Sequence, residues 1–247
     1  MTGEDLITHL RESILDDVAV PYLWQNTELL RYLNYAEVQS CRRAHLLIDS
    51  STANDSGTAG TASTAGQKPL CTLTVVQSQA TYLLSPKILM IKRCQLQSMT
   101  YPLPGPVSYD ELDDQLSGWL GTSGTVGTAG SGGFPSFFLN EPPNTITFVR
   151  APGASDTAML VVSRIPLVSF GLKTSPEIEE KYHIDLCDWA AHLAFMKPDS
   201  ETINLNLAKH YEDMFAAKFG PLQTAKSERW IKTLSMKQRM RPRAFGS

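Results

Sequence analysis

The sequence lacks the paired cysteines and long apolar runs that mark several large classes of protein. None of its four cysteines belongs to a Cys-x-x-Cys pair, which argues against zinc and redox motifs and favours small buried thiols. No stretch approaches the ~20 apolar residues that span a bilayer, so we expect no membrane partner. Glu4 and Asp5 stand where a signal peptide carries positive charge, so we expect no passage through a secretion pathway.

The chain also lacks a constellation of catalytic residues. Its five histidines are scattered, and none forms the i, i+4 pair with a neighbouring Glu that a helical zinc site needs. His183 lies near Asp188, but a histidine beside a carboxylate on a helix is far more often structural, and no Gly-x-Ser-x-Gly motif is present. We therefore expect no enzymatic activity, no metal site and no cofactor.

The charge of the chain is divided unevenly along its length. The whole chain carries a net charge of −3, while residues 226–247 contain seven basic residues and one acidic residue, a net of +6. The other 225 residues therefore carry −9. An acidic body with a basic end indicates that this end has a partner.

The first helix is predicted over residues 4–18, where apolar residues recur at the spacing of one helical face. Thr2 and Asp5 suit a capping box at its start. Pro21 ends it, because proline disfavours helical geometry at the residue before it.

The run Trp24–Ala36 opens a second helix, for which Asn26 is the predicted N-cap. Leucines and alanines follow at helical spacing, and we expect the helix to reach about Ile48. Two helices this close in sequence are expected to pack as a hairpin.

Two low-complexity stretches, residues 50–66 and 118–133, are rich in Gly, Thr, Ala and Ser. With so few large apolar side chains they do not offset the entropy of ordering, so both are predicted to be flexible loops. The glycines at 121, 124 and 127 do not have the spacing of a dinucleotide or phosphate-binding loop.

Around these stretches the sequence becomes rich in β-formers, with one short helix predicted at 108–117 and capped by Ser108. The turn at 77–80 joins the first two strands. Short strands are predicted at residues 70–76, 81–84, 88–96, 134–139, 145–150 and 157–167. About six short strands at this spacing favour an antiparallel sandwich or a small barrel.

Two more helices are predicted after the strands. Ser175 is a suitable N-cap, and Pro176 suits the first helical position because its fixed φ fits a helix. Residues 197–199 end this helix. The last helix is predicted over 201–219 and stops at Gly220.

These patterns predict an α+β fold. Residues 1–48 and 175–220 form an antiparallel helical bundle, and residues 49–174 form an inserted β-rich domain, an antiparallel sandwich or barrel. An extended basic C-terminal arm, residues 221–247, follows. The residues predicted for the core of the bundle are Trp24, Leu29, Leu33, Tyr182 and Trp189.

The order of helix pair, β insertion, helix pair and polar tail resembles the head-to-tail adaptor (connector) proteins of tailed bacteriophages. The resemblance rests on the runs Trp24–Ala36 and Ser175–Ala190 and on the ending Phe215–Pro221, and it extends over residues 1–235. The two Gly-Thr-Ala stretches depart from the family pattern as insertions.

The resemblance implies a virion structural protein whose copies form a ring, of about twelve, beneath the portal. Such a ring extends the DNA channel and offers a platform to the tail nozzle and tail tube proteins. Genomic DNA passes through it without specific binding. The implied location is the virion neck, at the junction of capsid and tail, with assembly in the host cytoplasm.

The C-terminal arm is the candidate portal-binding segment. A tryptophan in a basic run suits a buried anchor, and arginines suit pairing with carboxylates. The alternative interpretation is a solvated, disordered end, which is common for terminal runs of charge. The candidate portal-binding residues are Arg229, Trp230, Lys232, Lys237, Arg239, Arg241 and Arg243.

Two other functions are consistent with parts of the sequence. A host-binding or decoration protein would use aromatic residues of the β domain, such as Tyr101 and Tyr109, to stack on sugars. A DNA-binding protein would use the basic arm, with an affinity for duplex DNA that falls steeply with salt. An adaptor predicts salt-sensitive binding to the portal and little binding to free DNA.

Overall fold

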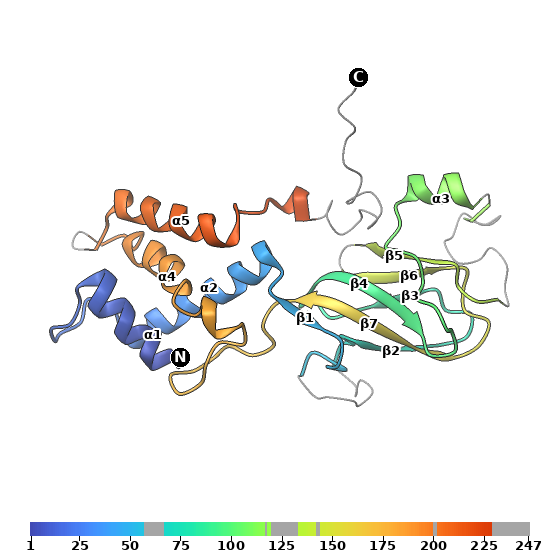
Figure 1. Ribbon diagram of the computed structural model, residues 1–247, viewed down its shortest axis with the longest axis horizontal. Helices are drawn as coiled ribbons and strands as arrows, with labels where there is room; N and C mark the ends of the chain where they lie inside the picture. The colour runs from blue at the N-terminus through green and yellow to red at the C-terminus, as the bar shows by residue number, and fades with distance from the viewer. Residues whose placement is uncertain (57–66, 117, 120–132, 142–143, 200–201, 229–247) are drawn as a thin grey trace, which may run out of the picture. The chain divides into compact units, whose positions relative to one another are not determined.

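The computed structural model divides the chain into two compact units (Figure 1). We call Met1–Leu47 with Ile165–Gln223 the helical unit, and Ile48–Arg164 with the chain from Thr224 onward the β unit. The residues that the structure describes are 1–56, 67–116, 118–119, 133–141, 144–199 and 202–228.

The helical unit begins with α1 (Gly3–Leu10), which continues into a π-helical turn, Arg11–Leu15. The predicted capping box is confirmed: Asp5 N donates to Thr2 Oγ1 at 3.3 Å, and Thr2 N donates to Asp5 Oδ2 at 2.8 Å. The helical geometry ends before residue 18, because Asp16 takes a left-handed conformation with φ of +50°.

The second helix, α2 (Asn26–Ala44), begins and ends earlier than predicted. Its N-cap is Gln25, so the assignment of Asn26 to that position was wrong. The predicted extension to Ile48 was also wrong. His45 adopts a left-handed conformation that ends the helix, and Leu47–Asp49 forms strand β1 on the edge of β7.

The prediction of a helix beginning at Ser175 was wrong. Residues before η2, a 3₁₀ turn at Glu180–Tyr182, are not helical, and α4 begins only at Leu186 and ends at Phe195. The cause is a buried carboxylate on α2. Glu37 Oε1 accepts from the backbone N–H of Glu177 at 2.5 Å and of Ile178 at 3.3 Å. These bonds hold the backbone at Glu177 and Ile178 outside a helix, although Pro176 and the glutamates that follow it favour the start of a helix locally.

The last helix, α5 (Leu205–Phe219), stops at Gly220 as predicted, but it begins four residues later than predicted, with Asn204 as its N-cap. α4 packs against both α2 and α5, and α1 packs against α2 and α4. Their apolar faces form one buried cluster, which includes Leu6, Leu10, Ala190 and Phe215. Residues from both ends of the chain therefore share a core.

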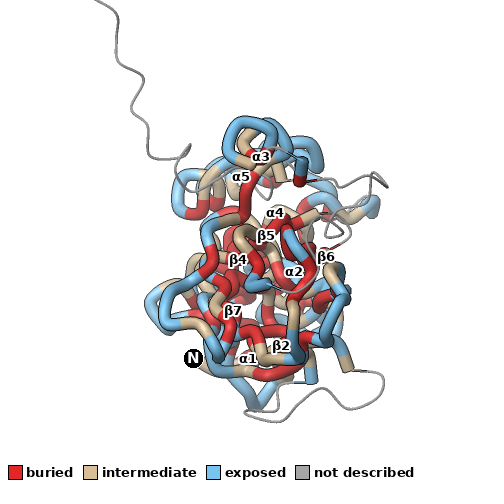
Figure 2. The backbone as a smooth tube through the Cα atoms, turned by 90° about the vertical axis from the view of Figure 1, so that its right-hand side faces the viewer, coloured by how far each residue is buried: buried red, intermediate tan, exposed pale blue. Residues whose placement is uncertain are grey.

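The β unit contains two antiparallel sheets. In the first, β7 (Asp156–Arg164) pairs along one edge with β4 (Ile88–Leu96) and along the other with β1 and β2 (Thr72–Val75). β4 and β7 bury most of their residues (Figure 2). The second sheet has the order β3-β6-β5. Its strands are β3 (Thr81–Leu83), β6 (Thr145–Val149) and β5 (Phe137–Glu141).

Several local predictions for this region hold and others do not. Helix α3 (Tyr109–Gln115) is capped by Ser108, which accepts from Glu111 N at 3.2 Å. Residues 77–80 connect the first two strands, yet these strands belong to different sheets. The two predicted flexible stretches begin later in the chain than predicted, because Ala53 and Trp119, near their first residues, are buried. The remainder of those stretches, 57–66 and 120–132, lies outside the described residues.

The chain is thus an α+β protein with antiparallel sheets. The strands that the structure describes form two open sheets and do not close into a barrel. Packing of these sheets as a sandwich stays a prediction.

Candidate assembly site in the helical unit

The predicted binding residues of the arm, from Arg229 to Arg243, lie outside the described residues. The structure describes the place where the arm begins, at the end of α5. Gly220 follows Phe219 with a φ of +94°, a conformation that favours glycine. Its carbonyl accepts a hydrogen bond of 3.1 Å from Arg43 Nη1. Arg43 of α2 therefore holds the first residue of the chain after α5.

Arg43 is buried between two aromatic rings. Its guanidinium carbon lies 4.8 Å from the ring centroid of Trp189 on α4 and 5.0 Å from that of Phe215 on α5. Desolvated cation–π contacts contribute about 2 kcal/mol, which offsets part of the cost of burying the charge. Nε and Nη2 of Arg43 have no hydrogen-bond partner among the described residues. One cation thus links α2, α4, α5 and the root of the arm.

The N-terminal residues predicted for the core lie in the buried cluster of the helical unit. Leu29 and Leu33 of α2 are fully buried. Trp24, which is 2% exposed, donates from Nε1 to the carbonyl of Ala194 at 3.3 Å. Its ring meets that of Phe195 edge-on, with centroids 6.4 Å apart. Trp24, two residues before α2, is therefore anchored on the end of α4.

The C-terminal residues predicted for the core lie at the other end of α4 and before it. Trp189 is 9% exposed, and its ring centroid is 5.2 Å from that of Phe215. Tyr182 is half-buried, packs against the cluster and places its ring 5.8 Å from that of Phe219. The structure brings all five predicted residues into one cluster.

Lys218, in the last turn of α5, binds two acidic residues at the start of α4. It donates to Asp185 Oδ1 and lies 3.5 Å from Asp188 Oδ2. Asp188 is buried, and the contact with Lys218 is the one partner of its Oδ2 in the described chain. Burial raises the pKa of Asp188 above its ordinary value, although Lys218 opposes the rise. The carboxylate is therefore incompletely compensated.

We expect Asp188→Asn to change how stability depends on pH. The folded-state pKa of Asp188 is raised above 3.8, so the folded state binds this proton more tightly than the unfolded state. Its contribution to stability therefore grows as the pH falls through the folded pKa. Urea unfolding at several pH values from about pH 7 down to about pH 4 measures the change, and the variant should gain less, or lose more, on acidification than the wild type. Asp213→Asn, at an exposed site on α5, is the matched control, and an equal change in Asp188→Asn and wild type would contradict the prediction.

A loop of residues 16–25 between α1 and α2 is built on a buried ion pair. Arg11 Nη1 bonds the carboxylate of Asp17, and both side chains are buried. Asp17 also accepts from the backbone N–H of Leu23 at 2.9 Å and of Trp24 at 3.3 Å. Arg11 Nη2 donates to the carbonyl of Trp24. These bonds fix the base of the loop at both ends.

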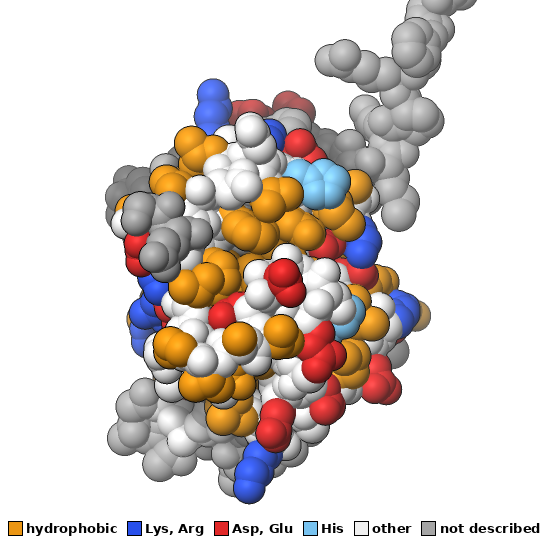
Figure 3. Space-filling view, turned by 90° about the vertical axis from the view of Figure 1, so that its left-hand side faces the viewer, with side chains coloured by type: hydrophobic (Ala, Val, Ile, Leu, Met, Phe, Trp, Pro, Cys, Tyr) orange, Lys and Arg blue, Asp and Glu red, His pale blue; other side chains and the backbone are white. Residues whose placement is uncertain are grey.

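The tip of this loop carries exposed apolar side chains. Val20 is 79% exposed, and Val18 and Leu23 are also exposed. The ring of Tyr22 lies 3.9 Å from the guanidinium carbon of Arg11. Figure 3 views the helical unit from the side on which the loop lies, and hydrophobic side chains occupy much of that face. Apolar groups that a rigid base presents to solvent suit contact with another protein.

The structure gives His183 a structural role. It is buried, its Nε2 lies 3.0 Å from the carbonyl of Ile178, and its Nδ1 lies 3.3 Å from the amine of Met1. Among the described residues, no group of three His, Cys, Asp or Glu side chains is placed to hold a metal ion. None of the helices in the described part of the chain is long and apolar enough to cross a membrane.

Sequence reasoning missed the buried charges of the helical unit: Arg11, Asp17, Glu37 and Arg43. For the three of them that lie on helices, Arg11, Glu37 and Arg43, the signal is their position on an apolar helical face. Arg11 follows Ile7 by four residues, and Arg43 lies two turns after Ala36, so both continue a buried stripe. A charge at such a position is buried only with a partner, which makes it a candidate for a structural link.

A family model with the description SU10 adaptor protein matches residues 1–241 of the chain. The match therefore includes both units and all but the last six residues. No curated protein matches the chain.

Proposed function

The chain belongs to the SU10 adaptor protein family, and from this membership we propose that it is a head-to-tail adaptor of a tailed bacteriophage. This family assignment confirms the resemblance predicted from the sequence. In the proposed role, about twelve copies form a ring beneath the portal, extend the DNA channel and offer a platform to tail nozzle and tail tube proteins. The observation that carries the proposal is the family match over residues 1–241.

The proposal assigns a task to each part of the chain. Residues 1–48 and 175–220, packed as an antiparallel bundle, form the wall of the ring, and the insertion 49–174, with its sheets packed as a sandwich, forms the platform. The acidic body, with a net charge of −9, repels phosphates weakly and lets genomic DNA pass without specific binding. The ring belongs to the virion neck, after assembly in the host cytoplasm.

The arm, residues 221–247, is proposed to bind the portal. Its basic residues pair with carboxylates, and Trp230 fills an apolar pocket. The clamp of Arg43 on Gly220 supports this role, because it fixes the point from which the arm extends. A fixed root reduces the conformational entropy that the arm loses on binding.

The test compares two triple substitutions in the full chain. We expect Arg239, Arg241 and Arg243 changed together to Gln to weaken binding to the portal protein of the same genome by about tenfold or more. Arg31, Arg93 and Lys173 changed to Gln form the matched control, because all three are exposed and lie outside the arm. Mass photometry of the adaptor alone and mixed with the portal measures both the binding and the number of copies.

The outcomes separate the candidate functions. Weakened portal binding by the arm variant alone, with steep salt dependence, supports the proposal. If both variants weakened portal binding equally, the effect would come from net charge, and the proposal that the arm binds the portal would be wrong. Tight binding of duplex DNA that the arm variant abolishes, without association with the portal, would favour a DNA-binding protein.

A further inference from the structure

The β unit contains a pocket of about 450 Å³, which we call the β7 pocket. Three segments line it: the end of β4 with the turn after it, residues 133–135 before β5, and residues 152–156, which lead into β7. All three belong to the β unit. Pockets of roughly 300–1,000 Å³ hold small ligands, so this one is large enough for a single side chain of another protein.

Backbone hydrogen bonds join the segments that line the β7 pocket. Gly153 N donates to the carbonyl of Gly133 at 3.1 Å, and this bond holds residues 133–135 against the turn before β7. Gln97 N donates to the carbonyl of Thr157 at 2.8 Å, and this bond holds the turn after β4 against β7. The pocket is therefore formed in the free protein, which lowers the entropy lost when a ligand binds.

Part of the lining is apolar. Leu96 is 1% exposed, and Pro135 and Pro152 are also buried. Phe134 lines the same pocket but is 63% exposed, so the fold leaves a large aromatic ring in contact with solvent. Such a ring suits contact with an apolar stem or a cationic group of a ligand.

Asp156, the first residue of β7, gives the pocket a fixed carboxylate. Its Oδ2 accepts from Ser98 Oγ at 2.5 Å and from Ser98 N at 3.2 Å, and its Oδ1 accepts from Thr157 N at 2.7 Å. Burial raises the pKa of Asp156, but these hydrogen bonds outweigh burial and hold the pKa below its ordinary value. The carboxylate is therefore ionised at neutral pH.

The charge of Asp156 has no counter-charge in the described part of the chain. No basic group there contributes to its pKa, and no described Lys or Arg lines the pocket. A carboxylate has about four acceptor positions. Three are occupied, and the remaining one is on Oδ1. The pocket therefore offers a cation one strong acceptor beside an apolar wall.

The single free acceptor favours one kind of cation. A guanidinium binds a carboxylate best through two parallel bonds, one to each oxygen, and Oδ2 of Asp156 has no position left for the second. A lysine ammonium is a compact point charge on an apolar four-carbon stem, so one acceptor and an apolar wall suit it. An anionic ligand would be repelled.

We propose that the β7 pocket binds the side chain of a lysine on a protein that docks on the β unit. The stem of the lysine packs against Leu96 and the ring of Phe134, and the ammonium donates to Asp156 Oδ1. A charge-assisted hydrogen bond in a preformed pocket fixes the register between two proteins.

The proposed adaptor has such a protein as its neighbour. The insertion 49–174, which contains the β7 pocket, is the proposed platform for the tail nozzle protein. The inference therefore rests on the proposed function, and its tests measure the pocket and the ring separately.

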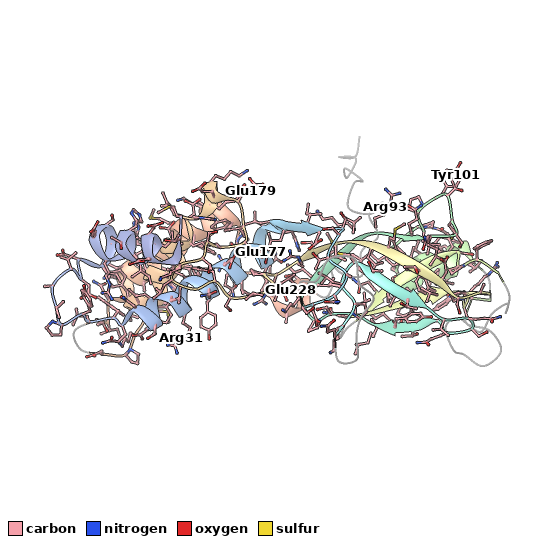
Figure 4. All side chains as sticks on the ribbon, turned by 90° about the horizontal axis from the view of Figure 1, so that it is seen from below. Arg31, Arg93, Tyr101, Glu177, Glu179 and Glu228 are labelled. Carbon is pink, nitrogen blue, oxygen red and sulfur yellow. The ribbon has the colours of Figure 1, made fainter. Side chains whose placement is uncertain are left out.

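The first test titrates n-butylammonium, which has the stem and the charge of a lysine side chain, into the full chain and follows binding by ligand-detected NMR. We expect saturable binding that Asp156→Asn weakens by about tenfold, because the charge of the acceptor is lost. Phe134→Ala should weaken it by about threefold. Asp110→Asn and Tyr101→Ala are the matched controls, because both residues are exposed and lie outside the pocket; Figure 4 shows Tyr101 projecting from the β unit.

Four results of this titration would overturn the proposal. The first is no binding of n-butylammonium, or binding that Asp156→Asn leaves unchanged. The second is tighter binding of n-butylguanidinium, which would assign the pocket to an arginine. The third is tighter binding of methyl glucoside, which would assign it to a sugar. The fourth is tighter binding of n-butylammonium after Lys232 and Lys237 are changed to Gln, which would show that the chain's own arm fills the pocket.

The second test uses the full chain with the portal and tail nozzle proteins of the same genome. We expect Asp156→Lys to leave ring formation on the portal unchanged and to weaken binding of the nozzle protein by about tenfold. Changing one exposed lysine of the nozzle protein to Glu should restore binding to Asp156→Lys alone. Asp110→Lys is the matched control. Mass photometry measures both the ring and the addition of the nozzle protein.

The outcomes separate the pocket from the ring. Unchanged binding of the nozzle protein by both Asp156→Lys and Asp156→Asn would overturn the inference and leave the proposed ring standing. Loss of the ring in Asp156→Lys, with binding of n-butylammonium to the wild type, would assign the lysine to a second copy of this chain and overturn the docking protein. Absence of any ring in the wild type would contradict the proposed function itself.

Discussion

Asp17→Ala is expected to lower the free energy of unfolding by about 3–5 kcal/mol, because it leaves the buried guanidinium of Arg11 without its counter-charge. Both partners are buried, and the carboxylate also accepts two backbone N–H groups of the loop before α2. The substitution therefore leaves one buried cation without its counter-charge and two backbone donors without their acceptor.

Urea unfolding monitored by circular dichroism measures this loss. Asp17→Asn retains one acceptor oxygen and should fall between the wild type and Asp17→Ala. Asp213→Ala is the matched control, because Asp213 pairs with Lys209 on the exposed face of α5, and we expect its effect to be small. If Asp17→Ala were no more destabilising than Asp213→Ala, the ion pair would not be the base of the loop.

The same pair determines whether the loop presents its apolar tip. In Asp17→Ala the N–H groups of Leu23 and Trp24 lose their acceptor, so the loop is freed at its end. Amide hydrogen exchange should therefore accelerate across residues 16–25 before it accelerates in α2. A loop that loses its fixed shape loses the preorganisation that makes Val18 and Val20 useful for binding.

Elements whose cause is local could be predicted from the sequence. The capping box of Thr2 and Asp5, the cap at Ser108 and the end of α5 at Gly220 each depend on residues a few positions apart. The helix predicted from Ser175 failed for the opposite reason. Its N–H groups bond Glu37, which lies 140 residues earlier, and no local pattern reports such a partner.

The candidate site divides in the same way. Helical periodicity located Leu29, Leu33 and Trp189, because apolar residues on one helical face are buried together. It did not show that Arg43 lies between the rings of Trp189 and Phe215, since a basic residue near the end of a helix also suits a solvent-exposed position there. Which residues meet across the two helix pairs depends on tertiary packing, and only the structure supplies it.

Trp189→Ala is expected to destabilise the helical unit by about 3–5 kcal/mol, the usual cost of truncating a large buried aromatic residue. Its ring contacts Phe215 and covers one face of the Arg43 guanidinium. Thermal and urea unfolding measure the change, and Trp189→Phe, which keeps an aromatic face, should cost much less. A loss below about 1 kcal/mol for Trp189→Ala would show that the residue does not belong to the core.

A double-mutant cycle with Arg43→Met separates the cation–π contact from simple burial. Met keeps the apolar stem of Arg43 and removes the charge, so the coupling between positions 43 and 189 isolates their interaction, expected at about 1 kcal/mol or more. Arg43→Met also removes the hydrogen bond to Gly220 and frees the root of the arm. It should therefore weaken portal binding even where it leaves the helical unit folded, whereas Trp189→Phe should preserve that binding. If portal binding in both variants followed global stability alone, Arg43 would have no role of its own in fixing the arm.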